Sequence, residues 1–220
     1  NMETIDYMPP IKKHRIAVET RDIYVPLAHR LGMSSVKSQL EDLVLSVLNP
    51  SGYKEIESKI KSSEKQRGKF IKKVIEPVSE ELKKYDIVPQ IYGRAKSYAS
   101  IYGKMINRNK GFNEIYDLYA IRIIVEKIEN CYLALGIVHS AYLPVQDRFK
   151  DFIATPKSNG YQSIHTTVIG PNGQKIEIQI RTTQMHEVAE LGVAAHWQYK
   201  QGAALTEGKR YRWVRQLLDI

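Results

Sequence analysis

The sequence has a single cysteine, Cys131, among its 220 residues. One thiol cannot close a disulfide within the chain, and it cannot supply the several thiolates of a cysteine zinc site. A chain without disulfides suits a reducing compartment, so we expect a cytoplasmic protein. Its fold has to be held by an apolar core, and a hydrophobic content of 43% is sufficient for one.

Long hydrophobic runs are also missing. No apolar stretch reaches the roughly 18 residues that a membrane-spanning helix needs, and the first residues lack the pattern of a signal peptide. We therefore expect no membrane partner. The chain begins at Asn1 and stops at Ile220 within a stretch of helical spacing. This predicts that both ends are cuts in a longer protein.

Two common site motifs are absent or incomplete. There is no Gly-x-x-x-x-Gly-Lys sequence, which excludes a Walker A phosphate loop. Residues 186–190, His-Glu-Val-Ala-Glu, begin like the His-Glu-x-x-His motif of metalloproteases, but Glu190 stands where the second histidine is required. We therefore reject a zinc protease and expect His186 and His196 to pack or to orient other groups.

Positive charge is what the chain has in excess. Lys and Arg number 33 against 24 Asp and Glu, which gives a formal net charge of +9. Such an excess favours nucleotides, nucleic acids or acidic membrane surfaces as partners. A generic basic surface explains the charge equally well, so the chemistry has to be sought in individual motifs.

The first 86 residues carry helical patterns. Apolar residues recur every three to four positions over residues 14–33, where Gly32 is a stop signal, and again over residues 34–49, with Ser34 or Ser35 as N-cap. The sequence Asn-Pro-Ser-Gly that follows is a helix-ending signal.

Residues 53–86 are charged and helical, and we expect the helix to break or to start afresh near Pro77. From about residue 87 the pattern changes to alternating strands and helices. The strands are expected at 87–93, 118–125, 149–154, 163–170 and 175–182, and the helices at 97–108 after the N-cap Ser97, at 130–143, and at 183–202. Pro171-Asn172-Gly173 is a hairpin turn signal. The order predicts an α+β fold, in which helices pack on a mixed β-sheet.

The last expected strand has two different faces. Isoleucine occupies every even position from 176 to 180, and these side chains share one face that we expect in the core. The opposite face carries the polar side chains of Lys175, Glu177, Gln179 and Arg181. A solvated outer face and the wall of a cleft both fit this pattern.

Two carboxylates can meet on neighbouring strands. Asp117 directly precedes the strand expected at 118–125, and Glu177 lies on the last strand. Mg²⁺ binds one or two carboxylates and fills its other positions with phosphate and water. The pair therefore fits a magnesium site, although aspartate before a strand is also a common turn residue.

A basic segment precedes the first sheet helix. Arg94 and Lys96 lie two apart in an extended stretch, and Ser100 and Lys104 lie four apart on the helix, so each pair shares a face. The helix N-terminus near Ser97 adds free N–H groups and partial positive charge. Together these groups predict a cradle for a triphosphate, and a solvated basic helix is the alternative.

Residues 148–165 combine cations with rings. The cations able to meet phosphates are Arg148, Lys150 and Lys157. Tyr161 can stack on a base, and Asn159-Gly160 permits a tight turn close to a ligand. His165 lies on a strand, where a lone histidine is more often a structural hydrogen-bonding group than a catalyst.

These segments are similar to a known family. The sequences YGRAKSYASIYGK, YDLYAIRIIV, RFKDFIATPKSNGYQSIHTTV, EIQIRT and MHEVAELGVAAHWQYK resemble, in the same order, the synthetase domain of the RelA/SpoT homologue (Rel) stringent-response enzymes. The likeness covers about residues 60–202. It implies a nucleotidyltransferase fold of the DNA polymerase beta type. It also implies transfer of the β,γ-pyrophosphate of ATP to the 3′-hydroxyl of GDP or GTP, which yields (p)ppGpp and AMP.

The resemblance also implies a domain plan. Residues 1–50 resemble the C-terminal end of the family's HD-type hydrolase domain, whose metal ligands would lie upstream, so we expect no hydrolase activity. Residues 51–86 are then a helical linker, residues 87–202 the synthetase domain, and residues 203–220 the start of a C-terminal helical extension. Contact with the ribosome is expected only through regulatory regions outside this sequence.

The resemblance assigns roles to individual residues. Asp117 and Glu177 resemble the Mg²⁺ ligands, and Glu177 also resembles the residue that activates the 3′-hydroxyl. Arg94 and Arg122 resemble the arginines that hold adenine of ATP. The residues that resemble contacts to the ATP phosphates are Lys96, Ser100 and Lys104. Arg94 and Lys104 also resemble catalytic residues. Those that resemble guanosine-nucleotide contacts are Arg148, Lys150, Lys157, Asn159, His165, Gln179 and the guanine-stacking Tyr161.

The acceptor nucleotide has its own sequence clue. Residues 148–151, Arg-Phe-Lys-Asp, match the RxKD form typical of bifunctional members and depart from the acidic ExDD form of RelA-type synthetases. This implies that GDP is at least as good an acceptor as GTP. Two other hypotheses remain: a non-catalytic RNA-binding module, and a different nucleotidyltransferase that releases pyrophosphate.

Overall fold

The structure is a computed structural model that describes residues 1–94, 96–109, 111–112 and 120–192, without the side chains of Ser63, Arg67, Arg94 and Arg108. Asp117, His196 and the C-terminal part of the helix predicted at 183–202 lie outside the described residues. So does the extension predicted at 203–220.

Helices dominate the first part of the chain and alternate with strands in the second. The helices are α1 (Pro10–Glu19), α2 (Val25–Arg30), α3 (Ser34–Leu48), α4 (Pro50–Lys83), α5 (Tyr98–Arg108), α6 (Ile128–Ala141) and α7 (Thr183–Leu191). The strands are β1 (Gln90–Arg94), β2 (Ala120–Val125), β3 (Leu143–Pro144), β4 (Lys150–Asp151), β5 (Ile164–Ile169) and β6 (Lys175–Thr182). Short helical turns are η1 (Ile5–Tyr7), η5 (Gln146–Arg148), η6 (Pro171–Gly173) and the π-helical η2 (Thr20–Tyr24), which joins α1 to α2.

The N-terminal helices form a small unit of their own. α3 packs along α1, η2 and α2, and a cluster of Met2, Ile5, Ala17 and Val44 is buried between them. This confirms the predicted all-helical segment. The predicted cap is wrong, because α3 begins at Ser34 itself and the residue before it makes no side-chain cap.

Helix α4 runs through Pro77 without a break, which contradicts the interruption predicted there. Val74, Val78 and Leu82 lie four residues apart on one face of the helix and are buried against the sheet, whereas Pro77 is exposed. An internal proline costs about 3 kcal/mol. Burying each of three aliphatic side chains contributes about 1.5–3 kcal/mol, so packing outweighs the local penalty.

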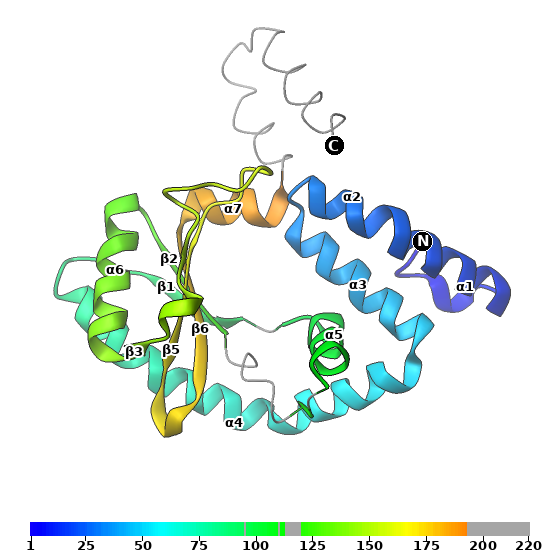
Figure 1. Ribbon diagram of the computed structural model, residues 1–220, viewed down its shortest axis with the longest axis horizontal. Coiled ribbons are helices and arrows are strands. Elements are labelled where there is room, and N and C mark those ends of the chain that lie inside the picture. Colours follow the sequence, from blue (N-terminus) through cyan, green and yellow to red (C-terminus); the bar gives the residue numbers. More distant parts are fainter. Residues whose placement is uncertain (95, 110, 113–119, 193–220) are drawn as a thin grey trace, which may run out of the picture.

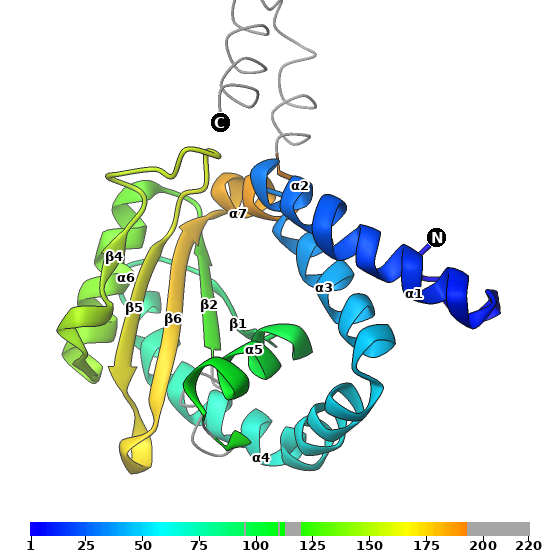
Figure 2. The same ribbon diagram turned by 45° about the vertical axis from the view of Figure 1, so that its right-hand side comes forward.

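The sheet has the order β1-β2-β6-β5-β3, with β4 also paired to β5. β2 and β6 are parallel and the other pairs are antiparallel, which confirms the predicted mixed sheet. α6 covers one face together with the end of α4, and the isoleucines of β6 are buried there as predicted. Figures 1 and 2 show α3 and α5 across the other face, with α7 at one end of the strands.

Two local features decide where strands begin and end. Asn172 and Gly173 both have positive φ, 61° and 72°, in the turn between β5 and β6, as the hairpin signal predicts. The strand predicted at 149–154 shrinks to β4, because the carboxylate of Asp151 accepts hydrogen bonds from the backbone N–H groups of Ile153 and Ala154 and turns the chain.

Candidate active site

The polar face of the sheet gathers the predicted site residues into two rows. One row crosses the strands through Tyr92, Arg122, Gln179, His165 and Lys150, each directly opposite the next in the strand register. Residues opposite each other across a sheet point to the same face. Residues more than 80 positions apart in sequence therefore share one surface.

The second row lies two residues along the strands. Arg94, Ala120, Glu177 and Thr167 are opposite one another, so the backbone of Arg94 is in line with Glu177. Asp117, the predicted second Mg²⁺ ligand, lies outside the described residues, as does the side chain of Arg94.

Glu177 is held by two donors. Lys96 Nζ donates a hydrogen bond to Oε2 at 2.7 Å, and Gln179 Nε2 donates to Oε1 at 2.9 Å. Burial by itself raises the pKa of Glu177, but the charge and hydrogen bond of Lys96 and the hydrogen bond of Gln179 outweigh it and lower the pKa to about 2. The carboxylate is ionised at neutral pH, and 22% of its side chain stays exposed.

Lys96 was predicted to contact ATP phosphates, and its ammonium lies beside the catalytic candidate. The side chain is 8% exposed and bridges from the segment after β1 to β6. Gln179 and Arg181, which share the face of Glu177, are 4% and 1% exposed. The polar face of β6 is therefore covered by other groups and is not the solvated surface that remained an alternative.

Helix α5 has the predicted N-cap, and backbone N–H groups in its first turn already donate hydrogen bonds to side chains. Ser97 Oγ accepts a hydrogen bond from the Ser100 N–H at 3.3 Å and donates one to Ser100 Oγ at 2.7 Å. Asp42 of α3 accepts a hydrogen bond from the Ala99 N–H at 2.8 Å. The expectation of free N–H groups for a phosphate is therefore wrong in this arrangement. Ser100 and Lys104 do lie one turn apart on the same helix.

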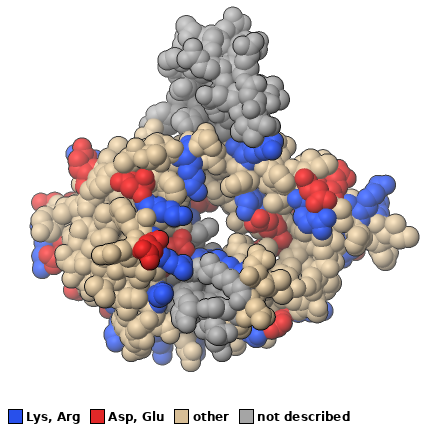
Figure 3. Space-filling view, in the orientation of Figure 1, with Lys and Arg blue, Asp and Glu red and all other residues tan. Residues whose placement is uncertain are grey.

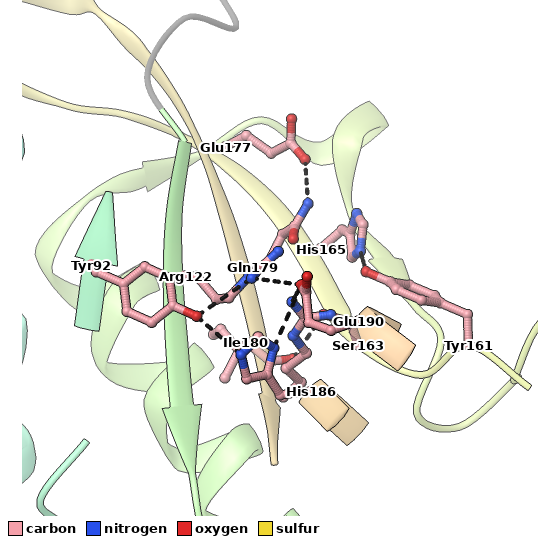
Figure 4. A network of polar contacts seen from close by, with 11 residues as sticks. Tyr92, Arg122, Tyr161, Ser163, His165, Glu177, Gln179, Ile180, His186 and Glu190 are labelled. Atoms are coloured by element: carbon pink, nitrogen blue, oxygen red, sulfur yellow. Dashed lines mark hydrogen bonds and ion pairs between the residues drawn. The ribbon is translucent and has the colours of Figure 1, made fainter. Parts of the chain in front are cut away.

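Arg122 belongs to a network that joins β1, β2 and α7 (Figure 4). Its Nη1 donates to Glu190 Oε1 at 2.9 Å and to Tyr92 Oη at 3.4 Å, and its Cζ lies 5.8 Å from the centre of the Tyr92 ring. Arg181 Nη2 donates to the same Glu190 oxygen at 3.5 Å. His186 Nε2 is 3.2 Å from Tyr92 Oη. The predicted adenine contact is therefore tethered on two sides.

The candidate guanine site is a cluster of rings with a cation over it. Tyr161 Oη and His165 Nε2 are 2.7 Å apart, and Phe152 meets both rings edge to face at centroid distances of 6.1 and 5.3 Å. Lys157 Nζ lies 4.6 Å from the Phe152 centroid and 5.1 Å from that of Tyr161. Burial, with a smaller effect of Lys150, lowers the pKa of Lys157. The structure thus brings Lys157, Tyr161 and His165 together.

Asn159 and Arg148, which were also predicted to contact the guanosine nucleotide, lie outside this ring cluster. Asn159 Nδ2 donates to the His29 carbonyl at 3.4 Å, at the end of α2, while its Oδ1 accepts from the Tyr161 N–H at 3.2 Å. Arg148 is exposed on η5. Asn159 therefore positions the loop that carries Tyr161 and links it to the N-terminal helices.

Several residues of the site were assigned no site role from the sequence. They are Asp42 on α3, Tyr92 on β1, Phe152, Arg181 on β6 and Glu190 on α7. Arg181 and Tyr92 stand on the same strand faces as predicted site residues, and that periodicity is the one available clue. Asp42 and Glu190 come from helices, and only the tertiary fold brings them in.

An opening separates the sheet from the α3–α5 side, and Lys, Arg, Asp and Glu side chains line its rim (Figure 3). Within the described ranges, no three His, Cys, Asp or Glu side chains cluster in a way that would hold a metal ion. No helix among these residues is both long and apolar enough to span a bilayer. The arrangement can bind anions and rings beside one ionised carboxylate.

Comparison with known proteins decides the family. The sequence matches the family described as "Region found in RelA / SpoT proteins" over residues 93–204, which is half of the chain. This chain belongs to the RelA/SpoT family. The RelA/SpoT match includes β2, β5, β6 and α7, the elements that carry Arg122, His165, Glu177 and Glu190.

Curated relatives are similar to the whole chain and not to the matched residues alone. A GTP pyrophosphokinase from Myxococcus xanthus is 44% identical over 221 residues, covering 100% of this chain and 29% of that protein. A bifunctional (p)ppGpp synthase/hydrolase RelA from Mycobacterium tuberculosis is 44% identical over 228 residues, covering 100% and 31%. The chain thus spans less than a third of the length of these RelA/SpoT relatives.

A solved structure supports the fold. The small alarmone synthetase 1 of Bacillus subtilis, bound to its product pppGpp, is 23% identical with a TM-score of 0.50 and covers 76% of this chain and 91% of that one. The likeness confirms a mixed sheet flanked by helices as the architecture of this RelA/SpoT chain.

Proposed function

We propose that this chain is a (p)ppGpp synthetase, which transfers the β,γ-pyrophosphate of ATP to the 3′-hydroxyl of GDP or GTP and releases AMP. The observation that carries the proposal is the position of Glu177. Its ionised carboxylate lies between Arg122 and Lys96 on one side and the ring cluster of Tyr161 and His165 on the other. The names of the relatives, GTP pyrophosphokinase and (p)ppGpp synthase/hydrolase, support it.

The donor nucleotide would occupy the β1–β2–α5 side. Arg94 and Arg122 would hold adenine, while Lys96, Ser100 and Lys104 would meet the phosphates. Transfer of a phosphoryl or pyrophosphoryl group needs positioning and charge neutralisation more than covalent help. Cations fixed before the reaction stabilise the developing charge without reorganising.

The acceptor would occupy the β5–β6 side. Tyr161 would stack on guanine, and Arg148, Lys150, Lys157, Asn159, His165 and Gln179 would surround the rest of the nucleotide. Glu177 would accept the proton of the 3′-hydroxyl, a role that typically contributes about 10²–10⁴-fold. GDP is proposed to be at least as good an acceptor as GTP, because residues 148–151 have the RxKD form.

Glu177 is also suited to a cation. Glu177 offers Mg²⁺ one ionised, partly exposed carboxylate, whose two oxygens accept hydrogen bonds from Lys96 and Gln179 in this structure. Glu177, with Asp117, would hold Mg²⁺, which supplies charge neutralisation at the phosphates when it is bound.

The remaining proposals concern the whole protein. Residues 1–50 would be the end of a hydrolase domain without its metal ligands, so this chain would not hydrolyse (p)ppGpp. Residues 51–86 would be a helical linker whose last turns pack into the core of the sheet, 87–202 the synthetase domain and 203–220 the start of a helical extension. Ribosome contact would come from regions outside this chain, and the protein would be located in the cytoplasm.

The test is incubation of the chain with ATP, GDP and Mg²⁺, followed by identification of the products. AMP and ppGpp are expected in equal amounts. Glu177→Gln should lower kcat by at least about 10²-fold while ATP binding is mostly kept. Glu129→Gln, an exposed substitution of the same kind at the start of α6, is the matched control and should keep full activity.

Other outcomes distinguish the alternatives. Release of free pyrophosphate would show a different nucleotidyltransferase. Absence of any product together with salt-dependent RNA binding would favour a binding module. Near-normal turnover by the Glu177→Gln variant would overturn the role assigned to this carboxylate.

A further inference from the structure

The network around Arg122 is unbalanced in charge. Arg122 and Arg181 are 8% and 1% exposed, and both donate to the same oxygen of Glu190. Their Nε atoms are buried, and neither has a hydrogen-bond partner in the part of the chain that the structure describes. Burying a charge is costly unless it is paired and hydrogen-bonded. Two guanidinium groups on one carboxylate are therefore an expensive arrangement if packing is its sole purpose.

The hydrogen bonds of Arg122 hold its guanidinium in one orientation. The N–H groups of arginine lie in the plane of the guanidinium, so acceptors at its edge leave its faces for stacking. Glu190 and Tyr92 both accept from Nη1 of Arg122, at 2.9 and 3.4 Å, and they come from α7 and β1. The orientation of Arg122 is thus set by two elements on opposite sides of it.

His186 lies beside both of these acceptors. It is one helical turn before Glu190 on α7, and its Nε2 is within hydrogen-bond distance of Tyr92 Oη, at 3.2 Å. Its buried Nδ1 lies 3.8 Å from Glu190 Oε1 and has no hydrogen-bond partner among the described residues. Burial, and then the charges of Arg181 and Arg122, lower the pKa of His186, which favours the neutral ring. A neutral His186 can bridge Tyr92 and α7 without taking the charge of Glu190 away from the arginines.

We propose that Glu190 is a positioning residue, which holds the guanidinium of Arg122 in the orientation that stacks on the base of the donor nucleotide. This inference rests on the proposed function, in which Arg122 contacts adenine. Glu190 itself need not touch the nucleotide. Its effect should therefore be confined to recognition of the donor base, and it should spare the phosphates and the acceptor.

Glu190→Gln tests this, because glutamine keeps the size and one acceptor oxygen while it removes the charge. The KM for ATP should rise by about tenfold, which corresponds to about 1.4 kcal/mol of binding. The kcat and the KM for GDP should stay within about twofold. Glu187→Gln on the exposed face of α7 is the matched control and should leave all three constants unchanged.

Direct binding measurements distinguish recognition of the adenine base from recognition of the phosphates, and they do not depend on turnover. Calorimetry with ATP and with inorganic tripolyphosphate should show weaker ATP binding by Glu190→Gln and unchanged tripolyphosphate binding. In an Arg122→Ala background, Glu190→Gln should have no further effect on ATP binding. If wild-type protein binds ATP but forms no ppGpp, the proposed reaction fails while this inference can still be tested.

A second variant covers the case in which Glu190→Gln does not fold. Tyr92→Phe keeps the ring beside Arg122 and removes the hydroxyl that Arg122 and His186 bind, so ATP binding should weaken about threefold with tripolyphosphate unaffected. Equal weakening of ATP and tripolyphosphate would overturn the inference. So would an effect of Glu190→Gln that persists without Arg122, because that would assign Glu190 to the packing of Arg181.

Discussion

Lys96 and Glu177, which are 81 positions apart in the sequence, form a partly buried ion pair with 2.7 Å between Nζ and Oε2. The lysine comes from the segment after β1 and the glutamate from β6, and β2 lies between these two strands in the sheet. In the proposed reaction, one partner meets the donor phosphates and the other takes the acceptor proton. The two halves of the site are therefore in direct electrostatic contact before any nucleotide binds.

This ion pair should make stability depend on pH. The pKa of Glu177 is lowered from 4.5 to about 2, so the folded state favours the ionised form. Its contribution to the free energy of unfolding is fully present above pH 4.5 and is lost as the pH falls from 4.5 towards 2. Thermal unfolding at several pH values should show Glu177→Gln less stable than wild type near neutral pH, with the difference shrinking in acid.

Lys96→Met provides the control for the pH experiment. It removes the charge that lowers the pKa of Glu177 and keeps most of the side-chain volume. The acid-dependent difference between glutamate and glutamine at position 177 should then largely disappear. A difference that persists in this background would show that Lys96 is not its source.

Tyr161 should act through its ring more than through its hydroxyl. Tyr161→Ala should raise the KM for GDP by about tenfold or more, because stacking of a base on an aromatic ring contributes about 1–3 kcal/mol. Tyr161→Phe keeps the ring and loses the hydrogen bond to His165, so its effect should be at most a few-fold. Steady-state kinetics measure both. A selective loss of ATP affinity in Tyr161→Ala would mean that the two nucleotide sites are exchanged.

Asp42 should stabilise the junction between α3 and α5 as an acceptor rather than as a charge. Burial raises the pKa of Asp42, although the N–H groups of Ala99 and Tyr98 act against it. Asp42→Ala should lower the free energy of unfolding by about 1 kcal/mol, the usual loss for a helix cap. Asp42→Asn keeps the oxygen and should lose less. Denaturant unfolding distinguishes the two variants, and equal losses would contradict the idea.

Cys131 should report on the packing of α6. The thiol is fully buried beside the sheet, and burial, followed by the charges of Asp151 and Glu129, raises its pKa to about 12. Reaction with iodoacetamide at neutral pH should therefore be very slow in the native state and fast in denaturant. Mass spectrometry measures the labelled fraction. Rapid labelling of the native protein would show that α6 opens readily.

Regular patterns made the sheet predictable. The alternation along β6 identified both its core face and its polar face, and the Pro-Asn-Gly signal located the hairpin, because strand period and turn chemistry act over a few residues. Ser97 caps α5 as expected for the same reason.

Features set by distant contacts were not predictable in this way. Pro77 stays inside α4 because the sheet packs against the neighbouring side chains, and Asp42 fills the end of α5 from another helix. Glu190 stands where a zinc motif would need a histidine, and its partnership with Arg122 depends on how α7 docks on the strands. Such contacts are decided by the tertiary fold.

The last turns of α4 have a practical consequence for anyone who wishes to dissect the protein. Val74, Val78 and Leu82 belong to the same buried cluster as two isoleucines of β2 and the three isoleucines of β6. A recombinant fragment that starts at residue 87 would expose the part of this face that α4 covers, and the exposed apolar side chains would make it prone to aggregate. The shortest fragment worth expressing should retain α4 from Phe70 onward, since Phe70 and Ile71 also pack on that cluster.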